Sequence, residues 1–512
     1  MMMRRFKLGL AAVLSLLLVL LAGCQAIGGV DVSKAVLGTL DVKSSMSKQT
    51  LSLQLVPADG KLKEEDRKAI EILNSLSVTI DQAILQDSKH MSMEGAVQFS
   101  GKKLPFHVAI DPKTMKLFVE GMTQPASVPL DMQELDMAFA GTKMTDETIM
   151  ESYKDIFGFL LKHAPNPSSI SVTPVTDTVN GESLSLQKLH IDIRGDELAD
   201  LAKGFLTSLS KDQEGMKELI GRLYDTYYPI FAAYAGTSED GKNALSKADK
   251  EKQINEAVKE LTSMLNELLP DYDKNVKELL ADSPELKDIL SKNTVLSLDL
   301  MLDSKLKIRK QIMDLTVQLP ATEDLPIKQV KVRSETEMWK INEPVTVHDV
   351  DSSKGVWDVT PGEGSPGAML RHVDRQSELY RLLKDDLKIT HKSFTLYSDE
   401  DPSILYDAGY EPVIVKGTLM VPVKYVADQL DADLKWDKAT KQMTLTDDLT
   451  GSKIVLKMGS KEASIDGVAQ TLSQPVQSFE GYAYVPMKFI TKALGAEGYW
   501  DAKELVLTIE RN

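Results

Sequence analysis

The sequence predicts an α+β protein, in which an antiparallel sheet covered by helices is followed by a C-terminal α+β repeat domain with pseudo-twofold symmetry. Three observations predict this class. Apolar residues alternate with polar ones over most of residues 46–130 and again over 296–332, which is the period of strands with one apolar face. Between these stretches the apolar period becomes helical, which indicates helices packed on one sheet face. Residues 417–445 also align without a gap on residues 481–509, at a constant offset of 64 positions.

The N-terminal segment has the pattern of a targeting signal. Three basic residues, Arg4, Arg5 and Lys7, precede an apolar run over residues 8–21. This run is shorter than the roughly 20 residues that a transmembrane helix needs, so it is expected to target the chain and not to span a membrane.

Small residues then lead into Cys24, the only cysteine of the chain. The stretch Leu21-Ala22-Gly23-Cys24 resembles the cleavage and lipidation site of bacterial lipoproteins. This resemblance implies that residues 1–23 are removed as a signal peptide and that Cys24 carries a thioether-linked diacylglycerol, with palmitate as an expected acyl chain. The alternative is an ordinary secretory signal followed by an incidental cysteine.

The lipid anchor would set the location of the chain and limit its chemistry. Two acyl chains hold a protein stably at a membrane, so we expect a lipid-anchored protein on the extracytoplasmic side of the cell membrane. With Cys24 lipidated, no cysteine remains for a disulfide or a thiolate metal site. The formal net charge of −16 argues against a nucleic-acid partner. Residues 24–45, with glycines at 28 and 29, are predicted to be a tether to the first domain.

Residues 46–345 are predicted to form the domain of sheet and helices. A helix over Lys61–Ile72 is expected to interrupt the first group of strands. Thr145 is a candidate N-cap for a helix that follows, and a longer helical stretch from residue 198 to 280 is expected to break at residues 236–241 and at Pro270. Between them, Val179-Asn180-Gly181-Glu182 has the sequence of a hairpin turn.

This pattern is loosely similar to that of the bacterial lipoprotein carrier family, whose curved sheet and helices enclose an apolar cavity. No motif matches residue by residue. Methionine and aromatic side chains adapt to varied apolar ligands, so six such residues are candidates for lining a pocket: Met91, Met93, Phe99, Phe106, Met115 and Phe118. The simpler interpretation is that they are core residues.

Residues 346–392 are predicted to be a linker with one short helix, over Ser377–Leu387. Residues 362–367 match the pattern Gly-x-Gly-x-x-Gly. The prolines at 361 and 366 and the lack of a surrounding βαβ pattern favour a turn-rich connection over a dinucleotide site. The acidic run over 399–401 and the pair Asp349 and Asp351 are candidates for weak Ca²⁺ binding, although solvated charges are the simpler interpretation.

The C-terminal domain, predicted over residues 393–512, contains the repeat. Each repeat is expected to have a strand, a Val-Pro step, a helix that begins just after the proline, and a strand after the tryptophan. Neither repeat is expected to bury its apolar side alone, so the two should pack as a pseudo-symmetric pair around their tryptophans. The matching residues that define the repeat are Val421, Pro422 and Trp436 in the first copy and Val485, Pro486 and Trp500 in the second.

These residues resemble the copper amine oxidase N-terminal-like domain, or stalk domain, of secreted and surface proteins of Gram-positive bacteria. The stretches that match are residues 419–426 with 432–437, and residues 484–490 with 494–496 and 500–501. The sequence departs from the family pattern at Lys424 and Lys488, which replace an arginine, at Asp431, which replaces a glycine, and at Gly498. The resemblance implies a module for spacing or for association with cell-wall or protein partners.

The residues do not support copper oxidase chemistry, which needs three histidine ligands and a tyrosine that becomes the quinone cofactor. None of the seven histidines lies between residues 392 and 512, and no asparagine is followed by a tyrosine. The sequence also lacks a Gly-Lys-Ser/Thr phosphate loop, a Gly-x-Ser-x-Gly motif and a His-Glu-x-x-His motif. We therefore predict no catalytic residues, no metal site and no cofactor.

Two functions remain, with a third that has less support. The first is a non-catalytic, lipid-anchored surface protein whose stalk repeat mediates spacing or association. The second is a carrier or sensor of an apolar ligand, which would bind to residues 46–345. An enzyme is the third, because dispersed carboxylates can form hydrolase sites that no sequence motif identifies.

Overall fold

The computed structural model describes residue 28 and residues 30–60, 62–130, 145–234, 247–320, 325–360, 365–398 and 409–512. The chain divides into two compact units: Met1–Leu117 with Leu130–Val350, and Phe118–Pro129 with Asp351–Asn512. Helices occur together with large, mainly antiparallel sheets, so the α+β class is confirmed. Within the described ranges, no helix is both long and apolar enough to cross a bilayer.

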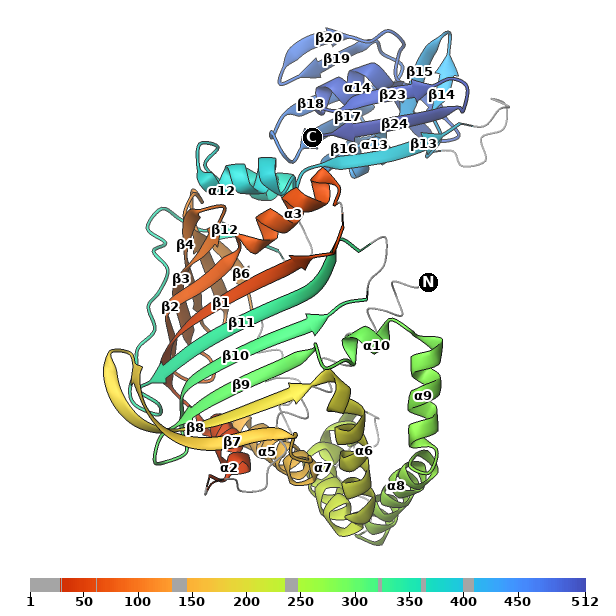
Figure 1. The fold of residues 1–512 in the computed structure, drawn as a ribbon. Helices are drawn as coiled ribbons and strands as arrows, with labels where there is room; N and C mark the ends of the chain where they lie inside the picture. The colour runs from red at the N-terminus through yellow and green to blue at the C-terminus, as the bar shows by residue number, and fades with distance from the viewer. Residues whose placement is uncertain are drawn as a thin grey trace. The chain divides into compact units, whose positions relative to one another are not determined.

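The first unit is built on a long twisted sheet (Figure 1), in which the strand order is β5-β4-β3-β2-β1-β11-β10-β9-β8-β7. β1 and β11 therefore pair at the centre of the sheet, although they come from opposite ends of the unit. The strands are β1 (Ser45–Pro57), β2 (Ser77–Leu85), β3 (Met91–Phe99), β4 (Lys102–Ile110), β5 (Thr114–Val119), β7 (Ser169–Val179), β8 (Glu182–Arg194), β9 (Val295–Leu302), β10 (Ile308–Gln318) and β11 (Ile327–Trp339).

The register of this sheet places apolar residues on one face. Leu53 of β1 lies opposite Val332 of β11, which lies opposite Leu315 of β10. Leu315 in turn lies opposite Leu296 of β9, which pairs with Ile193 of β8. Because side chains alternate between the two faces of a strand, these leucines, valines and isoleucines form one continuous apolar face, as the sequence period predicted.

The helices of this unit are α2 (Val32–Leu37), α3 (Glu64–Asn74), α5 (Asp146–His163), α6 (Leu198–Lys211), α7 (Gln213–Tyr234), α8 (Lys247–Leu268), α9 (Tyr272–Asp282) and α10 (Leu286–Ile289), with short 3₁₀ turns η1 (Gly38–Asp41) and η2 (Gly195–Glu197). The Thr145 side chain accepts the backbone N–H of Thr148, so the predicted N-cap of α5 is confirmed. Asn180 and Gly181 have φ values of +48° and +81°, as a two-residue hairpin turn between β7 and β8 requires. The predicted break at residues 236–241 lies outside the described residues.

The main core of this unit lies at one end of the sheet, where α2 and α6 cover β8 and β9. Leu198 and Leu201 of α6 pack there with Leu189 and Ile193 of β8 and Leu300 of β9. In contrast, Leu51 on β1 is 40% exposed. Burial on the apolar face therefore decreases from β8 and β9 toward the middle of the sheet.

The structure differs from the predicted tether over residues 24–45. Val30, Val32 and Ala35 are 4%, 1% and 1% exposed and belong to the core beside β8 and β9. Asn342, just after β11, also donates to the Asp41 carbonyl and accepts the Lys43 N–H. The sequence suggested a tether because of its glycines and small residues, but the apolar residues between them fold into the first unit.

In the second unit, the described part of the predicted linker is also folded. It contains β12 (Trp357–Asp358), α11 (Pro366–Leu370), α12 (Glu378–Arg381) and a π-helical turn, η3 (Leu382–Asp386), so the short helix predicted over Ser377–Leu387 is present. β12 pairs in parallel with β6 (Ala126–Pro129), and the Trp357 ring stacks on His372 with 4.1 Å between ring centroids. Gly367 lies against the backbone of Leu449, where an added Cβ would be 2.9 Å from the nitrogen.

The described part of the C-terminal module, residues 392–398 and 409–512, contains three small sheets and two helices. The sheet orders are β13-β24-β23, β14-β15-β22-β21 and β16-β17-β18-β19-β20. The elements are β13 (Lys392–Tyr397), β14 (Val413–Val415), β15 (Thr418–Pro422), α13 (Val423–Gln429), β16 (Ala432–Asp437), β17 (Gln442–Asp447), β18 (Lys453–Lys457), β19 (Glu462–Ile465), β20 (Val468–Thr471), β21 (Gln477–Phe479), β22 (Tyr482–Pro486), α14 (Met487–Ala493), β23 (Glu497–Asp501) and β24 (Val506–Arg511). Each helix begins directly after its Val-Pro step, as predicted.

The core of this module is not centred on the two tryptophans, so that expectation was wrong. Val421, Val426, Val485 and Ile490 are fully buried at its centre, and Trp500 packs against them from the side. Trp436 is 50% exposed. The repeated tryptophans therefore have different environments, although their positions in the repeats correspond.

Candidate functional site

The exposed face of Trp436 lines a pocket of about 370 Å³, which we call the Trp436 pocket. The start of α13, the strands β16 and β17, and the hairpin of β21 and β22 contribute to its wall. Residues that line it include Pro422, Val423, Lys424, Leu434, Trp436, Met443 and Tyr482. The pocket therefore combines two aromatic rings with apolar side chains and one lysine.

Local contacts position the two aromatic residues of this pocket. Trp436 lies opposite Met443 in the β16–β17 hairpin, and the Asp437 carboxylate closes the following turn by accepting the Ala439 N–H and the Thr440 hydroxyl. The Tyr482 ring lies on Gly409, where a Cβ would come within 2.6 Å of two ring carbons. Tyr482 is 44% exposed, so part of this residue faces solvent. Its ring also lies against Gly409, which leaves no room for it to move in that direction.

The corresponding position in the second repeat differs. Gly498 corresponds to Leu434, and the Met487 sulfur lies 2.5 Å from the position that a Cβ on Gly498 would occupy. Met487 of α14 corresponds to Val423 of α13. The longer Met487 side chain therefore fills the space that a leucine at position 498 of β23 would occupy. Gly498, which departs from the family pattern, is thus compensated by Met487, and the adjacent Trp500 packs against the core.

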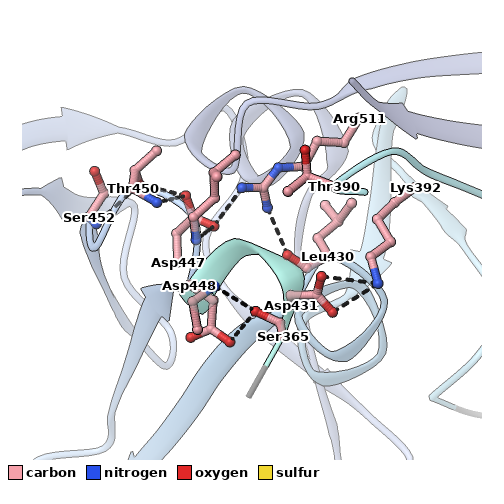
Figure 2. A network of polar contacts seen from close by, with 12 residues as sticks. Ser365, Thr390, Lys392, Leu430, Asp431, Asp447, Asp448, Thr450, Ser452 and Arg511 are labelled. Atoms are coloured by element: carbon pink, nitrogen blue, oxygen red, sulfur yellow. Dashed lines mark hydrogen bonds and ion pairs between the residues drawn. The ribbon is translucent and has the colours of Figure 1, made fainter. Parts of the chain in front are cut away.

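A buried polar network forms a second candidate, which Figure 2 shows. The side chains of Arg511 and Asp447 are 5% and 1% exposed, and Arg511 Nη2 lies 2.8 Å from Asp447 Oδ1. Arg511 Nη1 also donates to the Leu430 carbonyl at 2.7 Å, and Asp447 accepts the Thr450 N–H. Because these charges are paired and hydrogen-bonded inside the module, the network has a structural role.

Two neighbouring contacts extend this network. Lys392 Nζ lies 3.0 Å from an Asp431 carboxylate oxygen, and the Ser365 hydroxyl donates to Asp448 at 2.8 Å. Asp431 has φ +52°, and the corresponding Gly495 has φ +64°. The glycine that the family pattern expects at Asp431 is thus replaced by a residue that tolerates this left-handed conformation and gains an ion pair.

The first unit contains a larger pocket of about 760 Å³, which we call the α2 pocket. Its apolar walls include Ala35 and Leu37 of α2, Leu85 of β2, Ile308 of β10 and Met338 of β11. None of the six methionine and phenylalanine candidates lines it. Phe99 is a buried core residue, and the Phe106 ring lies against Gly95, 3.0 Å from the position of a Cβ there.

Three residues, His163 of α5, Ser208 of α6 and Asp212 between α6 and α7, resemble a catalytic arrangement. His163 Nδ1 lies 2.8 Å from the Ser208 hydroxyl, and His163 Nε2 lies 3.0 Å from Asp212 Oδ2. The second contact lacks hydrogen-bond alignment, and Asp212 also accepts from Lys162 and from the Gly215 N–H. Burial lowers the pKa of His163, and Lys162 adds to this effect. Since a nucleophile needs an aligned base and orienting group, we interpret this trio as a junction between α5, α6 and α7.

The polar face of the sheet carries a second histidine cluster. His190 Nδ1 lies 2.7 Å from Asp299, and Asp192 and Lys188 lie on the same face. The hydrogen bond to Asp299 raises the pKa of His190. Within the described ranges no group of three or more His, Cys, Asp or Glu side chains could hold a metal ion.

The other residues that the sequence singled out lie apart from the Trp436 pocket wall or pair with neighbours, with the exception of Pro422, which lines that pocket. Val421 and Val485 lie directly opposite each other in β15 and β22, and Pro422 and Pro486 end these strands. Asp349 pairs with Lys116 Nζ at 2.9 Å, and Asp351 accepts the Ser353 N–H. Cys24 and the acidic run over 399–401 lie outside the described residues. Tyr482 could not be identified as a site residue from the repeat, because Thr418 holds the equivalent position in the other copy and no aromatic pair recurs.

Comparison with known families gives one match. The family model of the copper amine oxidase N-terminal domain matches residues 404–509, about a fifth of the chain. That domain is non-catalytic. The match covers most of the C-terminal module, so the resemblance inferred there from the sequence is confirmed. No curated protein matches the chain.

Proposed function

We propose that this chain is a non-catalytic lipoprotein on the extracytoplasmic side of the cell membrane, whose C-terminal module associates with a cell-wall or protein partner. The Trp436 pocket is the observation that carries the proposal. Exposed aromatic rings next to an apolar pocket are typical of sites where a few residues supply most of the binding free energy.

The lipid anchor is supported by Leu21-Ala22-Gly23-Cys24 and by the basic and apolar segments that precede it. Metabolic labelling with an alkyne analogue of palmitate should label the wild-type chain and leave a Cys24→Ala variant unlabelled. Equal labelling of both chains would place the acyl group elsewhere, and no labelling of either would contradict the anchor.

We also propose that the two repeats are related by a pseudo-twofold axis. Met420 pairs with Pro486 and Pro422 with Tyr484, so an offset of 64 converts each pair into the other. The left-handed positions recur at the same offset, at Lys416 and Glu480 and at Lys441 and Leu505. Two equivalent, antiparallel strands that pair at equivalent residues are what a local twofold axis produces.

The last strand of each repeat also pairs with a strand from outside the two repeats. β13 precedes the first repeat but pairs with β24 of the second, whereas β18 follows the first repeat and pairs with its β17. Each repeat therefore pairs with a strand that is not part of the repeat: β18 for the first copy and β13 for the second. A single core shared by both repeats suits a module that presents a pocket to a partner.

The association is tested with the full-length protein and purified cell-wall sacculi. A Trp436→Ala variant should bind to them at least about tenfold more weakly than wild type, because it removes the exposed ring that lines the pocket. Tyr397→Ala is the matched control, since Tyr397 is an exposed aromatic residue of the same module that does not line the pocket. Unchanged unfolding temperatures would show that both variants are folded, and unchanged binding by Trp436→Ala would contradict the proposal.

A second candidate function is a carrier or sensor of an apolar ligand. The α2 pocket favours it, because its volume of about 760 Å³ lies within the range of ligand pockets, roughly 300–1,000 Å³. Native mass spectrometry of the purified chain should then detect a co-purifying apolar ligand. This ligand should be lost when the pocket is filled by a larger side chain at Gly38.

A further inference from the structure

The α2 pocket has walls that are held in fixed positions. Asn342 binds the backbone of residues 41 and 43, and Lys154 of α5 forms an ion pair with Asp41. On the opposite side, the Asp303 carboxylate accepts the N–H groups of Lys305 and Lys307 at 2.8 and 3.0 Å. The turn between β9 and β10 and the segment after α2 are therefore both fixed, and the pocket is a formed feature of the unit.

The α2 pocket has both an apolar wall and positively charged residues, which are the two features that bind an amphiphile with an anionic headgroup. Side chains such as Leu37, Ile308 and Met338 supply an apolar wall. Lys34 and Lys305 also line the pocket and are exposed, and neither has an ion-pair partner in the part of the chain that the structure describes. The third lysine, Lys307, donates to the Ile341 carbonyl at 3.2 Å.

The acidic residues of the pocket are already engaged. The Asp31 carboxylate accepts the backbone N–H of Lys34 as the N-cap of α2, and Asp41 is paired with Lys154. The local balance around the pocket is therefore positive, although the whole chain has a formal charge of −16. Distant charges are screened over about 8 Å at physiological ionic strength, so the field at the pocket depends on the charges that line it, which are three lysines and two aspartates.

The proposed anchor would keep this pocket close to the membrane. The first unit is folded from Val30 onward, and only residues 25–29 separate that position from Cys24. A fully extended chain rises at most about 3.3–3.6 Å per residue, so the lipid would lie within roughly 20 Å of Val30. Asp31, Lys34 and Ala35, which line the pocket, directly follow Val30.

We propose that the α2 pocket binds a single-chain amphiphile with an anionic headgroup, in which the acyl chain lies against the apolar wall and Lys34 and Lys305 contact the headgroup. The proposal rests on the second function above, the carrier or sensor of an apolar ligand, and specifies its ligand class. A free fatty acid and a lysophospholipid with an anionic headgroup share this chemistry.

The test uses the mature chain with Cys24→Ser, which needs no detergent because it lacks the lipid. Binding of a dansyl-labelled fatty acid is measured by fluorescence, and unlabelled dodecanoate, dodecanol and dodecyltrimethylammonium compete with it. Dodecanoate should displace the probe at concentrations at least about tenfold lower than the other two. Displacement by lysophosphatidylglycerol but not by dodecanoate would restrict the ligand to a phospholipid and overturn the free fatty acid.

Two variants locate the site. An added Cβ at Gly38 meets no atom within 4 Å and its φ is −63°, so Gly38→Phe can fill the pocket without backbone strain. It should weaken binding of the probe at least tenfold. The double variant Lys34→Gln/Lys305→Gln should weaken dodecanoate about five- to tenfold and leave dodecanol unchanged, whereas Lys292→Gln, an exposed lysine outside the pocket, should change neither.

The outcomes separate the two levels of the proposal. Equal displacement by dodecanol would overturn the anionic headgroup but leave an apolar carrier. Absence of any probe binding to the parent chain would overturn both. Unchanged binding by a folded Gly38→Phe variant would place the ligand outside this pocket, and if that variant does not fold, the lysine variants decide the question.

Discussion

The C-terminal module and the first unit, which we call the sheet unit from here on, bury their apolar residues in different ways. In the module, small sheets and two helices enclose one core, and the charges Arg511 and Asp447 are paired inside it. In the sheet unit, the core is concentrated where α2 and α6 meet β8 and β9, and leucines near the middle of the sheet stay partly exposed. A closed core suits a rigid module that presents a surface, and an apolar face with a pocket suits binding of an apolar molecule.

The largest expected effect concerns the buried ion pair of the module. Arg511→Ala should destabilise the module by about 3–5 kcal/mol, because it leaves the Asp447 carboxylate buried without its partner. Thermal unfolding followed by hydrogen exchange would measure the loss. Lys424→Ala, which removes an exposed ion pair to Asp428 at the wall of the Trp436 pocket and no buried charge, is the control and should cost at most about 0.5 kcal/mol. Similar losses for both variants would show that the module is not held together by its interior charges.

The next effect distinguishes the two parts of the sheet unit. Leu189→Ala should lower the free energy of unfolding by about 2–5 kcal/mol, since Leu189 of β8 is fully buried in the core that β9 and the helices complete. Leu51→Ala should cost less than about 1.5 kcal/mol, because its side chain is already 40% exposed. Urea denaturation of the two variants gives both values. A large loss at Leu51 would mean that the middle of the apolar face contributes to stability as the buried end does.

A smaller effect tests the left-handed positions of the module. Gly495→Ala should destabilise by about 1–2 kcal/mol, because its φ is +64° and an added Cβ meets no atom within 4 Å, so only backbone strain contributes. Asp431→Gly at the corresponding position removes the strain and the ion pair to Lys392 together, and should change stability by less than about 0.5 kcal/mol. Equal losses of unfolding free energy for the two variants would contradict a left-handed backbone conformation at both positions.

The smallest effect is the pH dependence between about pH 5.5 and 8, which should separate the sheet unit from the C-terminal module. No histidine lies between residues 392 and 512, so the module should show little change in this range. In the sheet unit, burial lowers the pKa of His163, so the unfolded chain binds the proton more readily and stability decreases as pH falls below about 6.5.

His190, also in the sheet unit, should contribute to the pH dependence with the opposite sign. The hydrogen bond to Asp299 raises the pKa of His190, so its contribution is fully present below about pH 6.5 and is lost as pH rises through the higher folded value. Hydrogen exchange of His163→Gln and His190→Gln at several pH values would measure both slopes. Slopes of the same sign would contradict one of these assignments.

Periodic patterns in the sequence predicted much of the fold. The alternation of Leu51, Leu53 and Leu55 predicted an apolar sheet face, Asn180-Gly181 predicted a hairpin, and the offset of 64 predicted matching elements in the module. These predictions succeed because strand period, turn conformation and repeat spacing depend on neighbouring residues or on duplicated sequence.

The candidate sites were less predictable, because they depend on residues far apart in the chain. The α2 pocket joins Leu37 to Ile308 and Met338, and the trio joins His163 at the end of α5 to Ser208 and Asp212, about 45 residues later in the chain. The exposure of Trp436 also could not be read from its repeat, since Trp500 has the same sequence position and packs against the core.

The sequence by itself determined the α+β class, the repeat, and the turns and caps, because each follows from short-range spacing and residue conformation. Only the tertiary structure decided that residues 30–45 belong to the first unit, that Arg511 pairs with Asp447, and that Met487 covers Gly498. The physical reason is that burial and side-chain contacts depend on which surfaces meet after folding. The same apolar or charged residue becomes a core residue, a pocket wall or an exposed side chain according to what packs against it.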